Sequence, residues 1–268
     1  MTSQLDAQSV FSTLKTIRYN QPLIHNITNL VVMNSSANAL LALGASPVMA
    51  HALREVRDMV TISSALVANI GTLSADWVEA MDLAMQQARD SHKPIVLDPV
   101  GAGATPYRTQ VTRRLLASNP VTVVRGNASE IAALVSDEST TKGVDATQPS
   151  QNAQEAARIL VKQYDCTVVV SGAVDTICDR HQTLHIANGH PLMAKVTGMG
   201  CNTSAFIAAC LSVTSPPPIA AATAMAVAGI AGEIAAEKAA GPGSLAVHFL
   251  DVLYNLDEAD IRQRLHCY

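Results

Sequence analysis

Short apolar runs that alternate with longer segments of helical periodicity constrain the fold of this chain most. The short runs are Pro22–His25, Ser46–Ala50, Leu66–Ile70, Pro94–Leu97, Val121–Val124 and Thr167–Val170. Between them, Asn29–Leu43 has helical spacing and stops at Gly44, a suitable C-terminal cap, and Ser74 caps a helix that continues to Arg89. Strands that alternate with helices predict an α/β fold with a mainly parallel sheet covered on both faces. Ligands of such sheets bind beyond the carboxyl ends of the strands.

The second half of the chain first extends this pattern and then leaves it. It is predicted to contain a polar surface loop, a helix, and a hairpin or two edge strands (Ser136–Pro149, Ser150–Gln163, and Val174–Ile177 with Leu184–Ile186). From Gly200 onward the pattern is helical, with breaks at Pro216–Pro218 and Gly241–Gly243. Since no low-complexity linker and no repeat interrupts residues 1–268, we expect a single domain.

The composition narrows the possible partners. Hydrophobic residues make up 49% of the chain but aromatic residues only 3%, so the core must consist of aliphatic side chains and methionine. A formal net charge of -4 lacks the basic footprint of a nucleic-acid binder. The five cysteines match no zinc template and are expected to be free thiols of a reducing cytosol (Cys166, Cys178, Cys201, Cys210 and Cys267).

Neither the N-terminal segment nor the most apolar stretch indicates a membrane protein. Met1–Tyr19 is polar, without the apolar core of a signal peptide. Ile219–Ala236 is the most apolar stretch, but it is rich in alanine and contains Glu233. A membrane span requires about 20 residues of stronger hydrophobicity, so we predict a buried helix there. We therefore expect a cytoplasmic protein with no membrane partner.

A glycine-rich segment opens the helical second half: Val196-Thr197-Gly198-Met199-Gly200-Cys201-Asn202-Thr203-Ser204-Ala205. Unpaired N–H groups at such a helix start, together with the helix dipole, form an anion hole, here predicted over Gly198, Met199, Gly200 and Cys201. The structural alternative is a plain glycine turn before a buried helix. A helix start also lowers the pKa of a cysteine, so a covalent role of Cys201 as nucleophile is a second alternative.

Two further segments carry acidic groups after predicted strands. Glu130, in Arg125-Gly126-Asn127-Ala128-Ser129-Glu130, could organise Mg²⁺ through water, with Arg125 facing phosphate oxygens. The structural alternative is a capping box of Asn127 and Glu130. Asp98 ends the run Pro94–Leu97 and is a metal- or water-binding candidate, or else the start of an Asx turn. The glycines after Asp98 lack the pattern of a dinucleotide-binding fingerprint.

Other strand ends carry small polar groups. His25 to Asn29 and Gly44 to Met49 suit an uncharged ring with a polar handle, although His25 and Met49 alone fit a structural histidine and a core residue equally well. Ser171 follows a late strand and either contacts phosphate or closes a turn. The sequence contains no Walker A motif and no protein-kinase motif, so phosphoryl transfer would require another scaffold.

Six segments together resemble the hydroxyethylthiazole kinase family, a thiamine-salvage branch of the ribokinase-like superfamily. They are His25-Asn26-Ile27-Thr28-Asn29, Ala42-Leu43-Gly44-Ala45-Ser46-Pro47-Val48-Met49, Asn69-Ile70-Gly71-Thr72-Leu73, Leu97-Asp98-Pro99-Val100-Gly101-Ala102, Arg125-Gly126-Asn127-Ala128-Ser129-Glu130 and Val196-Thr197-Gly198-Met199-Gly200-Cys201. The resemblance runs from about Pro22 to Phe249. It implies a ribokinase-like three-layer α/β/α fold and Mg-ATP-dependent phosphorylation of 4-methyl-5-(2-hydroxyethyl)thiazole.

The resemblance also assigns roles to individual residues. It places the thiazole at Asn29, Met49 and Gly198. It places ATP at Arg125 and Ser171, and Mg²⁺, through water, at Asp98 and Glu130. It further implies a homotrimer with sites near the subunit boundaries.

Cys201 departs from the wider superfamily, which usually has an aspartate base at this position. A thiol accepts a proton poorly at neutral pH unless its pKa is lowered. We hypothesise that Cys201, the catalytic candidate, positions the substrate hydroxyl more than it deprotonates it, because positioning and charge stabilisation dominate phosphoryl transfer.

Three other functions remain open at this point. A hydroxymethylpyrimidine kinase or a nucleotide-dependent repair dehydratase would keep the fold and change the substrate. A vitamin-binding or sensor protein would have lost catalysis, but the presence of Gly198, Gly200, Asp98 and Glu130 argues against it.

Overall fold

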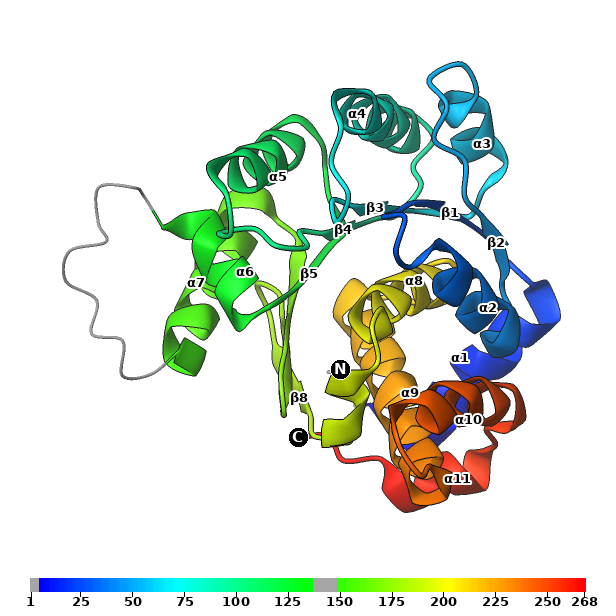
Figure 1. The fold of residues 1–268 in the computed structure, drawn as a ribbon. Helices are drawn as coiled ribbons and strands as arrows, with labels where there is room; N and C mark the ends of the chain where they lie inside the picture. The colour runs from blue at the N-terminus through cyan, green and yellow to red at the C-terminus, as the bar shows by residue number, and fades with distance from the viewer. Residues whose placement is uncertain (1–4, 137–148) are drawn as a thin grey trace.

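A single eight-stranded sheet forms the centre of the molecule, with strand order β2-β1-β3-β4-β5-β6-β7-β8. The computed structural model describes residues 5–136 and 149–268 (Figure 1). The strands are β1 (Leu23–Ile27), β2 (Ser46–Val48), β3 (Ala65–Asn69), β4 (Ile95–Asp98), β5 (Val123–Asn127), β6 (Thr167–Ser171), β7 (Asp175–Cys178) and β8 (Thr183–Ile186). Neighbours from β2 to β6 pair in parallel, and β7 and β8 add an antiparallel hairpin. The predicted α/β sheet and its late hairpin are thus confirmed.

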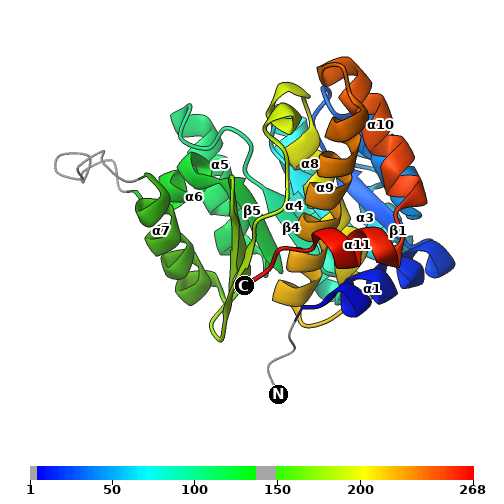
Figure 2. The same cartoon turned by 90° about the horizontal axis from the view of Figure 1, so that it is seen from below.

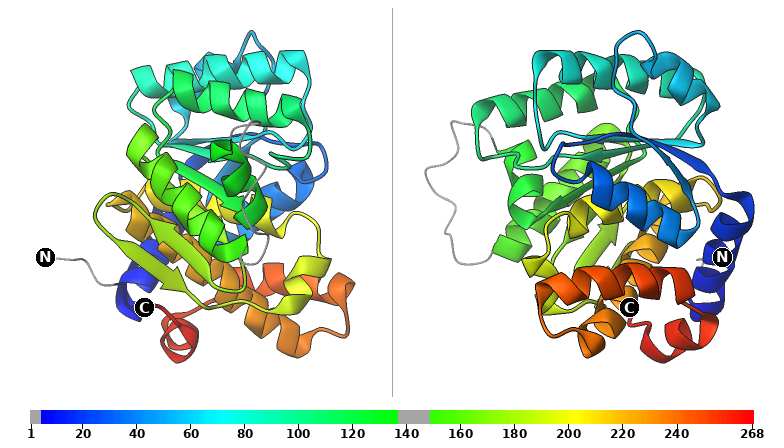
Figure 3. Two further views of the ribbon diagram at one scale, coloured as in Figure 1. Left: turned by 90° about the vertical axis from the view of Figure 1, so that its left-hand side faces the viewer. Right: turned by 45° about the vertical axis from the view of Figure 1, so that its right-hand side comes forward.

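Helices cover both faces of this sheet, which gives three layers (Figures 1 and 3). One face carries α3 (Val56–Ile62), α4 (Ala75–Asp90), α5 (Pro106–Ser118), α6 (Ala128–Val135) and α7 (Pro149–Tyr164). The other carries α1 (Ala7–Asn20), α2 (Met33–Leu43), α8 (Met199–Leu211), α9 (Pro217–Lys238), α10 (Pro242–Asn255) and α11 (Glu258–Arg264). Each layer buries its own apolar cluster against the sheet, which is the main stabilising term of the fold.

The predicted buried helix is α9. It is long and apolar enough to cross a membrane, but 89% of its most apolar window is buried inside the protein. Small side chains let α9 pack closely between α8 and α10, its main neighbours. Figure 2 shows α9 beside α8, with α11 and α1 lying side by side below them.

Helix boundaries follow local capping. Gly44 ends α2 with a φ of 106°, and Ser74 caps α4 by accepting a hydrogen bond from the N–H of Trp77 at 3.2 Å. The predicted start of α2 at Asn29 was wrong. The side chain of Asn29 accepts the N–H of Val31 at 3.1 Å, and this local turn delays the helix to Met33.

Several elements lie outside the sequence prediction. The helices α1, α3 and α5 were not predicted, because they are short or rich in polar residues, whereas α11 lies within the helical pattern expected from Gly200 onward. A 3-10 helix, η1 (Pro191–Lys195), connects the hairpin to α8. The predicted loop Ser136–Pro149 lies, apart from its two end residues, outside the described residues.

Candidate active site

The carboxyl ends of β1, β3 and β4 meet the N-terminal turns of α8 on one side of the sheet. Asn69 ends β3 and Asp98 ends β4, and the two residues are partners in the β3–β4 register. From α8, Cys201 and Ser204 reach toward them, and Asn29 follows β1. We call Asn29, Asn69, Asp98, Cys201 and Ser204 the Asn69 cluster.

The amide of Asn69 connects the whole cluster. Its nitrogen donates to Oδ2 of Asp98 at 2.8 Å and to the sulfur of Cys201 at 3.2 Å. Its oxygen accepts from Nδ2 of Asn29 at 2.9 Å and from the N–H of Gly71 at 2.9 Å. One side chain therefore fixes the relative positions of an amide, a carboxylate and a thiol.

Asp98 is fully buried and only partly hydrogen-bonded. Its Oδ2 also accepts from the hydroxyl of Ser204 at 2.8 Å, while its Oδ1 has no partner among the described residues. Burial raises the pKa of Asp98 to about 6, against the opposing effect of Arg125. The free oxygen is a buried polar atom that a ligand or a metal-bound water could satisfy.

Cys201 is an acceptor in this cluster. Its sulfur accepts from Asn69 and, at 3.6 Å, from Nδ2 of Asn29. Burial, followed by the nearby Asp98, raises the pKa of Cys201 to about 11. This is the opposite direction from the lowering that a helix start alone favours, so the thiol is protonated at neutral pH. Burial of the thiol beside Asp98 therefore gives no support to a thiolate nucleophile.

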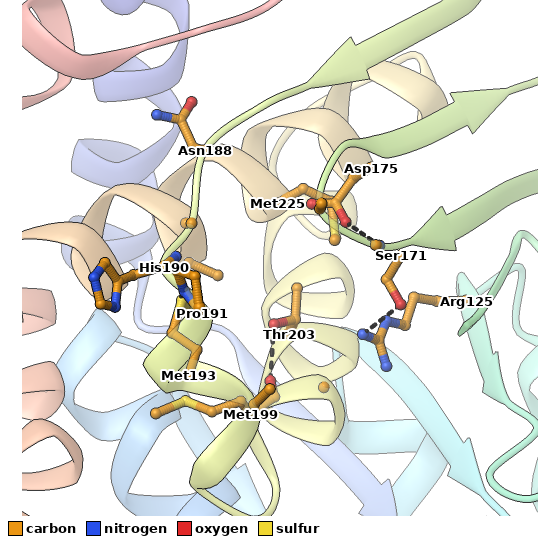
Figure 4. Close-up of a pocket in the computed structure, with 17 residues that line it drawn as sticks. Arg125, Ser171, Asp175, Asn188, His190, Pro191, Met193, Met199, Thr203 and Met225 are labelled. Atoms are coloured by element: carbon orange, nitrogen blue, oxygen red, sulfur yellow. Dashed lines mark hydrogen bonds between the residues drawn. The ribbon is translucent and has the colours of Figure 1, made fainter. Parts of the chain in front are cut away.

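Arg125 lies on the other side of the α8 N-terminus. Its Nη2 donates to the hydroxyl of Ser171 at 2.9 Å, and Nε of Arg125 has no partner in the described part of the chain (Figure 4). The guanidinium packs directly on Gly200, where an added Cβ would lie 2.5 Å from Nη1. The helix start is further shaped by Gly198, whose φ of 86° is a left-handed conformation that favours glycine.

A cavity of about 520 Å³ opens beside Arg125 and Ser171. It is bordered by the first turn of α8, by α9 and by the segment that leads into η1. Its apolar lining includes Met193, Met199 and Met225, and we call it the methionine cavity (Figure 4). A cavity of this size is typical of small-molecule sites.

Asp175 is a buried carboxylate in this cavity that the sequence analysis did not identify. Its Oδ1 accepts the N–H of Gly172 at 2.9 Å. Burial raises the pKa of Asp175 to about 6, although the nearby Arg125 opposes this shift. No short motif marks it, because its position depends on the turn between β6 and β7.

Glu130 forms the capping box that was the structural alternative. Its Oε2 accepts the N–H of Asn127 and its Oε1 the N–H of Gly101, both at 2.8 Å. The second bond ties α6 to the loop after β4, so Glu130 lies near the Asp98 side of the site. The negative charge of Glu130 also contributes to the raised pKa of Asp98, which agrees with that placement.

The residues present fit a magnesium ion bound largely by water and phosphate. Within residues 5–136 and 149–268, no three His, Cys, Asp or Glu side chains are grouped to hold a metal ion by themselves. Mg²⁺ commonly binds through one or two carboxylates and keeps several waters. The free Oδ1 of Asp98, with Glu130 nearby, matches that requirement.

Two predicted residues lie at the edge of this arrangement. Met49 directly follows β2, the strand next to β1, and is half-buried. Gly198 approaches the start of α2, where its added Cβ would lie 3.0 Å from Ser35 Oγ. Neither Met49 nor Gly198 lines the methionine cavity.

The three-layer fold, a helix start flanked by the Asn69 cluster and a cavity with an arginine together define a ribokinase-like small-molecule kinase. A sequence profile of the hydroxyethylthiazole kinase family matches residues 14–259. The chain therefore belongs to the hydroxyethylthiazole kinase family, which confirms the resemblance.

Individual relatives agree with this assignment. The chain is 57% identical over 263 residues to a hydroxyethylthiazole kinase of Syntrophus aciditrophicus, covering 98% of this chain and 97% of the relative. The structure of a hydroxyethylthiazole kinase protein from Pyrococcus horikoshii matches with a TM-score of 0.90 and 42% identity, over 97% of this chain and 98% of that chain. A pyridoxal kinase from Staphylococcus aureus, in complex with AMP-PCP and pyridoxal, shares the fold at 18% identity, with a TM-score of 0.61 over 79% and 88% of the two chains.

Proposed function

We propose that this protein phosphorylates the hydroxyl of 4-methyl-5-(2-hydroxyethyl)thiazole with Mg-ATP, which gives 4-methyl-5-(2-phosphooxyethyl)thiazole and ADP, in thiamine salvage. One observation carries the proposal. The N-terminus of α8 separates the Asn69 cluster, suited to an alcohol, from the methionine cavity with Arg125, suited to a nucleotide. Residues 1–268 act in this proposal as a single catalytic domain.

The alcohol is held at the Asn69 cluster. Two amides donate to the sulfur of Cys201, so its S–H is free to donate to the hydroxyl oxygen of the substrate. Because the thiol is protonated, it positions this oxygen and does not remove its proton. In a loose transition state the proton can leave late, to the oxygens of the transferred phosphoryl group.

The nucleotide is held on the side of the α8 N-terminus that faces the methionine cavity. Arg125 and Ser171 contact the phosphates, and the N–H groups of Gly198–Cys201 stabilise the charge that develops on the transferred group. The hydroxyl oxygen forms a bond to the γ-phosphorus while the bond from γ-phosphorus to the β–γ bridging oxygen breaks, and ADP leaves. The buried side chains of the Asn69 cluster exclude water from this step.

Asp98 and Glu130 hold Mg²⁺ through water in this proposal. The ion, when bound, neutralises charge on the β- and γ-phosphates. Asp98 supplies its free Oδ1 toward that side, while Asn69 and Ser204 fix its other oxygen.

The thiazole ring is proposed to lie near Asn29, Met49 and Gly198, close to a subunit boundary of a homotrimer. Leu30 and Val31, which follow Asn29 directly, are 61% and 68% exposed, and a neighbouring subunit would cover them. Light scattering after size-exclusion chromatography should give three times the chain mass, and a monomer would contradict the trimer.

We propose a cytoplasmic location, and partners that are only the thiazole, ATP and other copies of the chain. The five cysteines are free, which suits a reducing compartment. Neither nucleic acid nor membrane takes part in the proposed reaction.

Release of ADP tests the function. Mg-ATP is incubated with 4-methyl-5-(2-hydroxyethyl)thiazole, hydroxymethylpyrimidine, ribose or no alcohol. Release that depends on the thiazole and on Mg²⁺ is expected. ADP release with another alcohol but not with the thiazole would overturn the assignment of the substrate. No release with any alcohol would favour a binding protein.

A further inference from the structure

The walls of the methionine cavity that lie away from Arg125 present few groups able to recognise a particular nucleobase. These walls come from α9 and from the segment leading into η1, with Pro191, Met193, Met225 and Ala228 among their side chains. In Figure 4, Pro191 and Met193 lie across the cavity from Arg125. Among the described residues that line the cavity there is no Phe, Tyr or Trp, and the one aromatic ring, the imidazole of His190, is exposed and directed away from Arg125, so a base has no large ring to stack on.

The polar side chain of Asn188 is directed to the protein scaffold. Its Nδ2 donates to Oε1 of Glu233 at 3.0 Å and to the carbonyl of Arg264 at 2.6 Å. Its Oδ1 accepts the N–H of His266 at 2.9 Å. The N–H of Gly189 donates to the same Glu233 oxygen at 2.9 Å. These hydrogen bonds anchor the segment that leads into η1 to α9 and to the C-terminal residues. Both amide hydrogens of Asn188 are donated to protein acceptors.

The next residues of the wall are engaged in the same way. Nδ1 of His190 accepts the N–H of Leu192 at 3.2 Å, and the N–H of Met193 donates to the carbonyl of His190 at 2.9 Å. The His190 ring is exposed and points away from Arg125 (Figure 4). The hydroxyl of Thr203 donates to the carbonyl of Met199 at 2.9 Å.

Asp175 is a further buried polar side chain that lines the cavity. It lies on the Arg125 side of the cavity, and one of its oxygens already accepts the N–H of Gly172. A carboxylate only accepts hydrogen bonds, and each of the four common bases offers an N–H donor, so Asp175 does not separate them strongly.

We propose that the methionine cavity recognises the triphosphate and accepts any of the four common bases, so that GTP, CTP and UTP serve as phosphoryl donors as well as ATP. This inference rests on the proposed kinase function. Methionine is unbranched and polarisable, and it adapts to flat surfaces of different outline. A site that hydrogen-bonds its ligand discriminates by about 10⁴-fold or more, whereas an apolar pocket discriminates by only about 10- to 200-fold.

The test measures thiazole phosphate directly with each of the four nucleoside triphosphates. The full-length protein, Mg²⁺ and the thiazole are held constant, and GTP, CTP and UTP are first freed of ATP with hexokinase and glucose. We expect values of kcat/KM within about 200-fold of one another. A spread above about 200-fold overturns the inference, while ATP-dependent activity leaves the proposed function intact. No product with any donor would overturn both.

Two further measurements separate base recognition from catalysis. Calorimetric titration with ADP, GDP, CDP and UDP should give dissociation constants within the same range, and binding of ADP alone would contradict the inference. Asp175→Asn keeps an acceptor for Gly172. The ratio of kcat/KM for ATP to that for GTP should change by less than about threefold in this variant, because Asp175 does not read the base. A larger change would assign base recognition to Asp175 and overturn the inference.

Discussion

The Asn69 cluster and the methionine cavity flank the same helix start but are built on opposite principles. In the cluster, polar side chains hydrogen-bond to one another, and Asn69 alone makes three such contacts besides accepting the backbone N–H of Gly71. In the methionine cavity, polar groups such as the Asn188 amide are directed to the scaffold, and methionines face the space.

Because of this difference, the Asn69 cluster requires one precise geometry, whereas the methionine cavity tolerates changes of shape. A buried polar network has one satisfied arrangement, and each lost partner leaves a buried group unpaired. An apolar wall loses only contact area and can repack. We therefore expect the two regions to respond to substitution on very different scales.

Replacement of Asn69 by aspartate should have the largest effect. The new carboxylate would face Asp98, 2.8 Å from the present amide nitrogen, and could not donate to the Cys201 sulfur. Like charges at this distance cannot both ionise, and the positions of Cys201 and Asp98 would be lost together. We expect kcat to fall on the order of a thousandfold.

The matched control for this variant is Asn152→Asp, the same change on the exposed surface of α7. It should leave kcat unchanged. Thermal melting must show that Asn69→Asp is folded. A folded Asn69→Asp variant with more than a tenth of the original kcat would show that the network is not needed for catalysis.

Gly200→Ala should disturb the junction between the two regions. The new Cβ would lie 2.5 Å from Nη1 of Arg125 and displace the guanidinium. A misplacement of about 1 Å at a reacting group costs on the order of a hundredfold, so kcat/KM for ATP should fall by about that factor.

Gly243→Ala, in α10, is the control for Gly200→Ala, because an added Cβ there meets nothing within 4 Å. Its kinetics should equal those of the original protein. If both alanine variants kept full activity, direct packing of Arg125 on Gly200 would not matter for the nucleotide.

Much of the fold was predictable because it depends on local patterns. The alternation of β-rich runs and helical segments predicted the parallel sheet, and Gly44 and Ser74 marked helix ends correctly. The start of α2 was not predictable from periodicity alone, since the turn at Asn29 competes with the helix. The helices α1 and α11 pack against each other over a long sequence distance, which no local pattern reports.

The candidate site was predictable only in part, for a related reason. Asp98 was identified because it ends a strand. It accepts a hydrogen bond from Ser204 of α8, the helix that the glycine-rich segment opens. The central role of Asn69 arises from the register of β3 with β4 and from the docking of α8. Ser204 and Asp175 likewise acquire their positions only from tertiary packing. The assigned ligand contacts remain predictions.

Cys201→Ala should have a smaller effect than either change above. The variant removes a positioning contact and leaves Asp98, Asn69 and Ser204 in place, so kcat should fall by about tenfold or less. The thiol, with a pKa of about 11, is protonated throughout pH 6 to 9. Its ionisation therefore adds no rise in activity with pH, and the pH profiles of the two proteins should have the same shape.

Two outcomes would restore a base role for Cys201. One is a rise in kcat with pH that is present in the original protein and absent in Cys201→Ala. The other is a Cys201→Ser variant that binds the thiazole normally, measured by calorimetry, but has no turnover.

Met225→Leu should have the smallest effect, and it tests the tolerant side of the comparison. Met225 is only 5% exposed, so the substitution changes a well-packed wall of the methionine cavity. Leucine has a similar volume, and such exchanges typically cost less than about 1.5 kcal/mol. The KM for ATP should change by less than about fivefold and kcat should stay constant. A rise in KM of more than fiftyfold for ATP but not for GTP would mean that this wall is shaped for adenine. The Asn69 cluster and the methionine cavity would then depend on precise geometry to the same degree.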